Sequence, residues 1–427
     1  MPTATAHLKS LAVTAAFLCA VTGSTQAATH GERLEGRAPT QEELRPSVEA
    51  AFQGESVKQD TIASLVLFNR VRGLTLQVFR TGPERTPTVG YSEMQGVPVT
   101  PLERIGNGAP GRVIHVQVGD WPSGVYFARL TAADGRIGFA PIVVAPSHLG
   151  EHRVAVVEPT LTWQAYNLRD DTGDGKGDSW YANWHVHTVR LDRPFLSRGV
   201  PYHFHNYDLP FLHWLAWNGH QADYLSDADL DAVSDSHALA AAYDLIIFPG
   251  HHEYVTAREY RTVEGYRDLG GNLAFLSANN FFWRVVRHGR TIDRTSQWRN
   301  LGRPEDALIG TEYRGNDGGG HRAPWIVRDT AVAQWLFAGT GLTDGSTFGS
   351  GGIEIDKTNS GSPSHVHVIA EIPDLLGPGF TAQMTYYENG AGAKVFASGA
   401  FQLVASVLDE PCGSQLLTNL WNKLSQP

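Results

Sequence analysis

The hydrophobic positions of the chain follow a short-strand pattern between residues 61 and 148. Apolar and β-branched runs alternate there with turns of Gly, Pro and Asp, and Asp134-Gly135 separates two alternating runs in the manner of a hairpin. The predicted strands cover 74–79, 112–118, 124–130 and 137–144. Strands of this length and spacing predict a β-sandwich of the immunoglobulin-like kind, and its simplest interpretation is a domain with no chemistry of its own.

The pattern changes after residue 149, where apolar runs are continuous and are separated by helical periodicity. Continuous runs of this kind are typical of strands buried on both faces of a parallel sheet. The predicted strands cover 154–157, 243–248 and 272–276, and the predicted helices cover 208–218, with Asp208 as a candidate N-cap, and 256–269. Alternating strands and helices predict an α/β domain with a mainly parallel sheet. Past residue 310 the chain is rich in Gly, which favours an irregular or β-containing extension before a last helical segment at 403–424.

The first residues have the order of a secretory signal peptide: Lys9, an apolar run over 11–21 and a string of small residues ending at Ala28. The mature protein is therefore expected to be secreted. No later segment supplies about 18 uninterrupted apolar residues, so no membrane span is expected. The predicted organisation is a signal peptide at 1–27, a polar lead-in segment at 28–60, a β-sandwich domain at 61–148 and an α/β domain at 149–427. The fold class is thus multidomain α+β.

Polar side chains follow each predicted parallel strand. Tyr166 comes after the first strand, His251 and Glu253 after the second, and Asn279 after the third. Ligands of open α/β sheets bind outside the carboxyl ends of the strands, so these side chains are expected to meet in one crevice. Tyr207 stands at the start of a helix and would lie on the same side of the sheet.

Phenolate and carboxylate oxygens in one crevice are suited to a hard metal ion. The alternative is that Tyr166 and Tyr207 are core residues whose hydroxyls find a buried partner, which is the commoner role of a tyrosine. For His251 and Glu253 a functional role is favoured more strongly, because imidazole and carboxylate groups gathered at a strand end are seldom buried without a purpose.

These residues resemble a known family. The segments around Tyr166-Asn167, Asn206-Tyr207-Asp208, Gly250-His251-His252-Glu253-Tyr254 and Trp283-Arg284 are similar to the large (beta) subunit of N,N-dimethylformamidase. The resemblance implies a mononuclear Fe(III) ion held by Tyr166, Tyr207 and Glu253. It also implies that His251, Asn279 and Glu354 take part in catalysis, although an exposed surface position for Glu354 is equally compatible with its Gly-rich surroundings.

Two further segments are candidate sites. Asp170, Asp174 and Asp178 have the spacing of acids in calcium loops, but Tyr181 stands where an EF-hand has its last Glu, so a solvated acidic loop is the alternative to a Ca²⁺ site. The aromatic and His-rich stretch between residues 180 and 205 is interpreted either as a wall of the crevice or as a loop packed over the sheet.

Net charge and the absence of a Cys at one turn exclude two classes of function. The formal net charge of −10 argues against nucleic acid as a partner. The strand followed by a Gly250 turn also occurs in glutamine-amidotransferase-like folds, where a nucleophilic Cys occupies the turn, but here His251 and His252 stand in its place. The first hypothesis is a secreted, iron-dependent hydrolase of an amide C–N bond, acting on a small molecule or an exposed amide. The second is a secreted binding module for a glycan or a cell-wall ligand.

Overall fold

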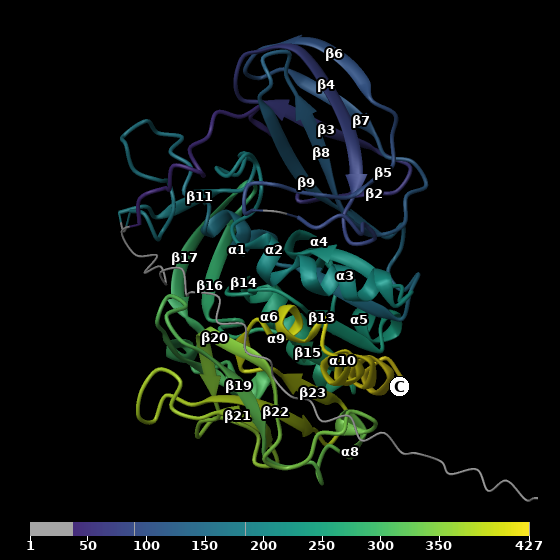
Figure 1. Ribbon diagram of the computed structural model, residues 1–427, viewed down its shortest axis with the longest axis vertical. Coiled ribbons are helices and arrows are strands. Elements are labelled where there is room, and N and C mark those ends of the chain that lie inside the picture. Colours follow the sequence, from purple (N-terminus) through teal and green to yellow (C-terminus); the bar gives the residue numbers. More distant parts are fainter. Residues whose placement is uncertain (1–36, 89, 184, 427) are drawn as a thin grey trace, which may run out of the picture.

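The structure is a computed structural model that describes residues 37–88, 90–183 and 185–426. The predicted signal peptide lies outside these residues. The described chain is a mixed α+β protein made of several sheets and rather few helices (Figure 1). Within the described residues no helix has both the length and the apolar character needed to cross a membrane.

Two sheets face each other in the N-terminal part of the chain. One has the order β1-β3-β7, and the other has the order β2-β9-β8-β4-β5 with β6 beside β4. Buried side chains of both sheets, among them Leu65, Val78 and Tyr126, form one shared core. The strands are β1 (Ala50–Phe52), β2 (Ser56–Lys58), β3 (Ile62–Leu67), β4 (Val71–Arg80), β5 (Val97–Pro98), β6 (Glu103–Gly108), β7 (Val113–Gln117), β8 (Gly124–Thr131) and β9 (Ile137–Ala145).

The predicted hairpin is present between β8 and β9. Asp134 accepts a hydrogen bond from the backbone of Arg136 at 3.1 Å, and Gly135 adopts a φ of 86°, which glycine adopts without strain. One boundary differs from the prediction. The segment 28–60 is not only a lead-in, because β1 pairs with β3 and β2 pairs with β9; these three-residue strands are too short to give a periodic signal.

The largest sheet is mixed, with the order β12-β10-β13-β15-β23-β22-β21-β19-β20-β18 and with β24 paired to β20. The first five strands are mutually parallel, and the rest pair antiparallel. The prediction of a mainly parallel sheet therefore holds for only part of it, because the Gly-rich segment after residue 310 supplies antiparallel strands. The strands are β10 (Val154–Glu158), β12 (Asp223–Ser226), β13 (Leu245–Phe248), β15 (Asn272–Phe275), β18 (Glu312–Asn316), β19 (Arg322–Val327), β20 (Thr347–Lys357), β21 (His367–Ile372), β22 (Ala382–Glu388), β23 (Lys394–Ala397) and β24 (Ala400–Phe401).

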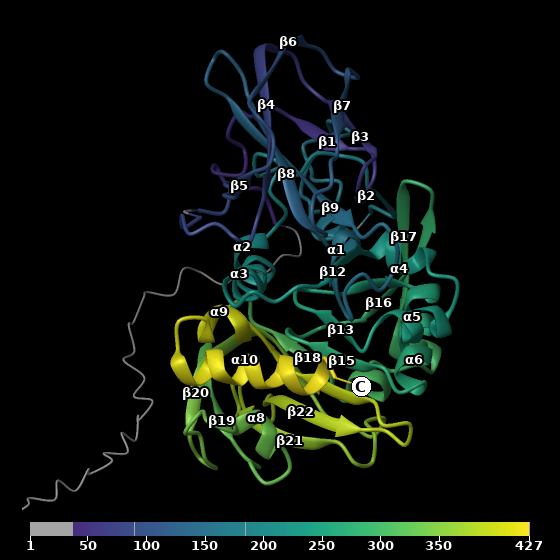
Figure 2. The same cartoon turned by 90° about the vertical axis from the view of Figure 1, so that its right-hand side faces the viewer.

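A small sheet with the order β11-β17-β16-β14 flanks the large one (Figures 1 and 2). Its strand β14 directly follows the loop after β13, so this sheet fixes where that loop leads. The strands are β11 (Thr188–Arg190), β14 (Tyr254–Thr256), β16 (Trp283–His288) and β17 (Thr291–Gln297).

The predicted helices are confirmed with small shifts. Thr256 and Glu259 form a capping box that starts α6, whereas Asp208 precedes α3 without capping it, because its side chain turns toward Gly250 instead. The predicted helix 403–424 is two helices, and Pro411 begins the second. The helices are α1 (Thr160–Ala165), α2 (Phe204–Tyr207), α3 (Leu209–Trp217), α4 (Asp227–Ala232), α5 (Ser236–Ala242), α6 (Ala257–Asp268), α7 (Asp306–Ile309), α8 (Gln334–Phe337), α9 (Leu403–Val407) and α10 (Pro411–Leu424), with a 3₁₀ turn, η1, at Trp298–Leu301.

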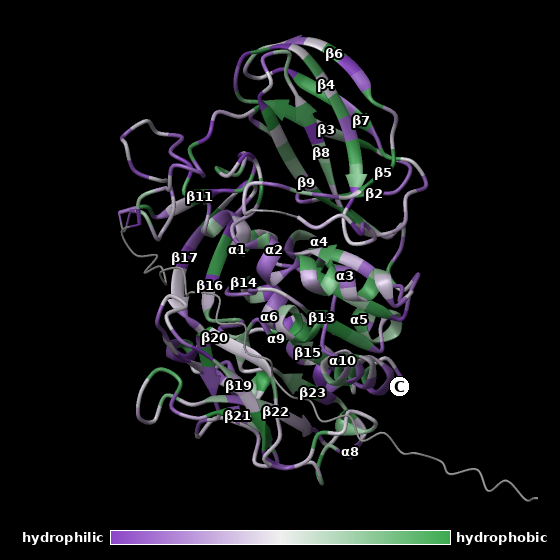
Figure 3. Cartoon of the chain, viewed as in Figure 1, coloured by the Kyte–Doolittle hydropathy of each residue, from purple (hydrophilic) through white to green (hydrophobic). Residues whose placement is uncertain are grey.

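The N-terminal sheets and the large sheet share part of one hydrophobic core. Phe127 and Phe139 of the N-terminal sheet belong to the same buried cluster as Val156 of β10 and Phe211 of α3. Figure 3 colours the central strand β13 as hydrophobic and the outer strand β6 as largely hydrophilic. The central parallel strands are therefore held from several sides, which gives the loops at their carboxyl ends a rigid base.

Replacement of Phe248 tests whether the core beneath these loops is tightly packed. Phe248 is fully buried at the end of β13 and stacks on Phe275 with ring centroids 4.9 Å apart. We expect Phe248→Ala to lower the free energy of unfolding by about 3–5 kcal/mol, because it leaves a cavity. Phe380→Ala, at a side chain that is 45% exposed, should lower it by about 1 kcal/mol or less. Urea denaturation measures both, and equal losses would contradict the assignment of Phe248 to the core.

Candidate functional site

The loops after β13 and β15 run side by side. The Phe281 N–H donates to the His252 carbonyl at 2.6 Å, and the Trp283 N–H donates to the Glu253 carbonyl at 2.8 Å. The structure thus brings His251, Glu253 and Asn279 together, as the strand-end rule predicts.

Glu253 is the centre of the arrangement. Its Oε2 accepts a hydrogen bond from the Tyr166 hydroxyl at 2.6 Å and from the Tyr181 hydroxyl at 2.7 Å, and the Tyr181 and Tyr254 hydroxyls bond to each other. The Tyr166 and Tyr181 rings stack with centroids 4.0 Å apart. Glu253 is only 3% exposed, and this burial raises the pKa of its carboxyl to about 7 despite the two phenol donors. A carboxylate and a phenol oxygen therefore lie in direct contact inside the protein.

His251 lies between two carboxylates. Its Nε2 atom is 3.5 Å from Glu253 Oε2 and 3.5 Å from Glu354 Oε2, and Asn279 Nδ2 is 3.4 Å from the same nitrogen. Burial lowers the pKa of His251 to about 3, so the ring is neutral. Such an imidazole has one N–H donor and one acceptor to offer to the groups around it.

Glu354 is a buried member of the site and not a surface residue. It is 4% exposed, and burial, followed by the nearby Glu253 carboxylate, raises the pKa of its carboxyl well above the usual range. Asn316, its cross-strand partner in β18, donates to Glu354 Oε1 at 2.6 Å. The other oxygen, Oε2, is buried without a hydrogen-bond partner among the described residues.

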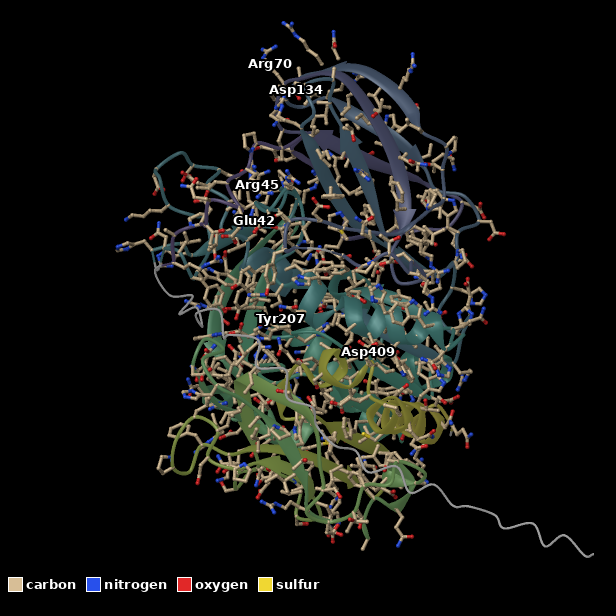
Figure 4. The ribbon with its side chains drawn as sticks, in the orientation of Figure 1. Glu42, Arg45, Arg70, Asp134, Tyr207 and Asp409 are labelled. Carbon is tan, nitrogen blue, oxygen red and sulfur yellow. The ribbon has the colours of Figure 1, made fainter. Side chains whose placement is uncertain are left out.

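Tyr207 reaches the same place from α2. It lines a cavity of about 350 Å³ together with Tyr166, His251 and Glu354, and its ring packs on Phe401 with centroids 4.8 Å apart. Its hydroxyl forms no hydrogen bond with a residue that the structure describes. In Figure 4, Tyr207 lies near the middle of the molecule, between Glu42 of the N-terminal segment and Asp409.

Backbone strain gathers around this cavity. His203 and Asn279 adopt φ values of 54°, Ile353 before Glu354 has a φ of 69°, and Gln402 after Phe401 has a φ of 75°. Positive φ is costly for residues other than glycine, and such strain is concentrated at functional sites. The backbone of Asn279 is held in place by Asp356, whose two oxygens accept from its N–H at 2.9 and 3.1 Å.

The predicted ligand set fits a hard metal ion. Tyr166 and Tyr207 line one cavity, and Tyr166 donates to Glu253. The nearby Glu354 Oε2 and the Asn279 amide oxygen are buried without a hydrogen-bond partner among the described residues. A cation would compensate the cost of burying Glu253 and Glu354 close together. Within the described residues no group of three or more His, Cys, Asp or Glu side chains is arranged around a metal position, so a centre here depends on the tyrosines.

The three acids of the candidate calcium loop, Asp170, Asp174 and Asp178, do not point their carboxylates toward one position. Asp170 accepts from the N–H groups of Gly173 and Gly175, and Asp178 accepts from those of Asp171 and Thr172, at 2.6 to 3.0 Å. Asp174 accepts from the N–H of Lys176. In the part of the chain that is described, the three acids thus serve to fold the loop on itself, and they do not converge on a common point.

Both interpretations of the aromatic stretch are partly correct. Tyr181 contacts Glu253, and Tyr202 and His203 line the cavity, whereas His185 and His187 lie at or near the surface.

Sequence reasoning missed several residues of the cavity. Asn316 and Arg322 come from the Gly-rich segment, Phe401 follows β23, and Arg37 and Glu43 come from the predicted lead-in. Arg37 donates to Glu43 at 2.7 Å and lies over the Tyr202 ring. Long-range strand pairing places Asn316, Arg322 and Phe401, and contacts distant in the sequence place Arg37 and Glu43, so no local spacing signals any of them.

Comparison with known proteins identifies the class of this α+β chain. A model of the family described as N,N-dimethylformamidase beta subunit-like, C-terminal, matches residues 112–414. The chain belongs to this family, which indicates an amidohydrolase-type function. The match begins at Arg112, inside the predicted sandwich domain.

Other comparisons add little. A search of curated proteins found no match. Similar solved structures include superoxide reductase (neelaredoxin) from Ignicoccus hospitalis, which is 17% identical over 24% of this chain and 79% of that chain, with a TM-score of 0.15. A cycloisomaltooligosaccharide glucanotransferase from Paenibacillus sp. is 9% identical over 54% of this chain and 44% of that chain, with a TM-score of 0.16. Likenesses at these scores carry no argument about this chain.

Substitution of Gly250 tests how closely the chain packs beneath the site. A Cβ atom at position 250 would overlap Asp208 Oδ1 and would lie 3.3 Å from Pro159 Cγ. We expect Gly250→Ala to lower the free energy of unfolding by about 1–3 kcal/mol through overpacking. Gly390→Ala, where a Cβ meets no atom within 4 Å, should be neutral or stabilising by up to about 1 kcal/mol. Urea denaturation of the two variants compares them, and identical stabilities would refute the close approach of Asp208.

Proposed function

We propose that this protein hydrolyses an amide C–N bond other than a peptide bond, with a mononuclear ferric ion bound by Tyr166, Tyr207 and Glu253. The observation that carries the proposal is the hydrogen bond between Tyr166 and Glu253, which lies beside His251 and a buried, half-unpartnered Glu354. Family membership supports the reaction class.

A bound ferric ion would supply Lewis acidity toward the amide carbonyl and toward water. The protein's own groups would do the rest. Asp356 holds the backbone of Asn279, and the Asn279 side-chain amide is placed to donate to the carbonyl oxygen as negative charge develops there. His251 would orient the attacking water, because its neutral ring faces both Glu253 and Glu354.

Glu354 is the group best placed to move protons. Water adds to the carbonyl carbon, the C–N bond breaks, and the proton lost by the water goes to the departing nitrogen, which gives a carboxylic acid and an amine. Glu354 Oε2 is buried and has no hydrogen-bond partner among the described residues, so it is available to accept that proton and return it. Asn316 holds the other carboxylate oxygen and keeps Oε2 directed toward His251.

We also propose that the protein is secreted, on the basis of the predicted signal peptide at 1–27. Two finer descriptions of the fold belong to the same proposal. The two facing N-terminal sheets with one core support an immunoglobulin-like sandwich. The parallel strands with helices, and the turn at Gly250, support a glutamine-amidotransferase-like fold for the second domain.

Metal content is the first test. We expect protein purified without chelators to contain stoichiometric iron and to show a visible absorption band from tyrosinate bound to Fe(III). Tyr166→Phe and Tyr207→Phe should each weaken and shift the band, and the double variant should lose it, whereas Tyr386→Phe, whose hydroxyl bonds to Glu388, should keep it. Elemental analysis and absorption spectra measure this. A colourless, iron-free protein would contradict the ferric centre.

Glu354→Gln tests the proton-moving role. We expect kcat for hydrolysis of a small amide to fall by about 100-fold or more, while iron content stays unchanged. Glu371→Gln removes a partly exposed carboxylate that pairs with Arg328 and should leave kcat within about twofold. Steady-state kinetics on the iron-loaded variants measure kcat, and an unchanged kcat in Glu354→Gln would contradict its proton-moving role. A protein that binds glycans and cleaves no amide would instead support the binding-module hypothesis.

A further inference from the structure

Arg322 is a cation of the cavity wall without a protein partner. Its guanidinium makes no hydrogen bond or ion pair with any residue that the structure describes. Other arginines near the site are paired: Arg37 with Glu43, and Arg299 with Glu305. Arg322 is exposed, so its five N–H donors are open to solvent and to a ligand, and they are suited to a planar, bidentate anion.

Strand pairing places Arg322 beside the reacting groups. It is the first residue of β19 and pairs with Gly352 of β20, two positions before Glu354. The neighbouring strand β18 supplies Asn316 opposite Glu354, so three adjacent strands present their polar side chains to one cavity. Tyr207 lines the same cavity as Arg322 and Glu354.

A second donor lies on the same wall. His203 lines the cavity, adopts a strained backbone with a φ of 54°, and has a buried Nδ1 atom without a hydrogen-bond partner. The His203 ring packs on the Tyr207 ring with centroids 5.1 Å apart. Glu42, on the N-terminal segment, is the exposed acid of the cavity rim.

The rest of the wall is aromatic. The Tyr202 ring stacks on Tyr166 with centroids 5.8 Å apart, Tyr91 meets His203 edge to face, and Phe401 packs on both Tyr207 and His251. The cavity of about 350 Å³ lies in the range of about 300–1,000 Å³ that is typical of sites for drug-sized ligands. This space suits a substrate with an apolar or aromatic group as well as the amide.

We infer that the substrate is an amide that also carries a carboxylate, such as an N-acyl amino acid, and that Arg322 binds this carboxylate while the aromatic wall receives the side chain. The inference rests on the proposed hydrolase function, which it makes more specific. Arg322 is then the residue that determines specificity, because only an amide with the negative charge forms an ion pair with its guanidinium.

Two probes that differ by one carboxylate test the inference. N-acetylphenylalanine carries the anion, and N-acetylphenethylamine lacks it. Isothermal titration calorimetry on the iron-loaded protein gives the affinities, and amine release gives kcat/KM. We expect the anion to be preferred by about tenfold or more in both measurements, because a charge-assisted hydrogen bond is worth at least that factor. The preference should weaken as salt is added.

Variants assign the preference to one side chain. Arg322→Gln should abolish it, and Arg322→Lys should keep part of it as a point charge. Arg328→Gln removes an exposed arginine close by in the sequence and should leave the preference intact.

The outcomes separate the two proposals. Cleavage of both probes with equal efficiency would overturn the inference and leave the hydrolase standing. Binding of the anion that depends on Arg322, without cleavage of either probe, would support the inference about the site and contradict the hydrolase. A protein that neither binds nor cleaves either probe would overturn both proposals. A preference for the anion that survives in Arg322→Gln would overturn the role of Arg322.

Discussion

Burial of the Glu253 carboxylate is the constraint on which the site depends. A carboxylate removed from water is costly unless donors or a cation surround it. Tyr166 and Tyr181 provide two donors, and their rings stack so that both hydroxyls point at one oxygen. To hold these rings, the chain needs α1 on one side and the loop before β11 on the other, both packed against the small flanking sheet. The geometry of the small flanking sheet follows from the same requirement, because β14 begins at Tyr254, directly after Glu253.

The two halves of the large sheet contribute different parts of the site. The parallel half ends in loops that supply His251, Glu253 and Asn279. The antiparallel half supplies Glu354 and its partner Asn316 from the faces of strands. Side chains on paired strands have little freedom, so Glu354 is held at a fixed distance from His251 even though its own segment is rich in Gly. The glycines there permit the bulges that turn β20 into the cavity.

The sequence predicts the parts of this structure that are encoded locally. The strands β4, β8, β10, β13 and β15 and the helices α3 and α6 follow from periodicity, and the rule for strand ends gathers His251, Glu253 and Asn279. The antiparallel strands have no such signal, because their pairing is set by contacts distant in the chain. For this reason Asn316 and Arg322 could not be placed in advance, and neither could Arg37 and Glu43 of the N-terminal segment. Asp208 is a different case: a local rule assigned it to a helix cap, but its side chain faces Gly250.

The strained backbone positions explain how separate segments can hold one cavity. His203, Asn279, Ile353 and Gln402 belong to four segments distant in sequence, and each lies in or next to the cavity. A residue keeps such a conformation only where its surroundings fix it from several sides. Asp356 illustrates this, because one carboxylate on β20 binds the backbone of Asn279 in the loop after β15 and thereby ties the two halves of the sheet together. The site is thus stiff because several distant segments fix each part of it. A rigid cavity of this kind selects a ligand whose charges match the fixed positions of its own side chains, and it adapts little to other ligands.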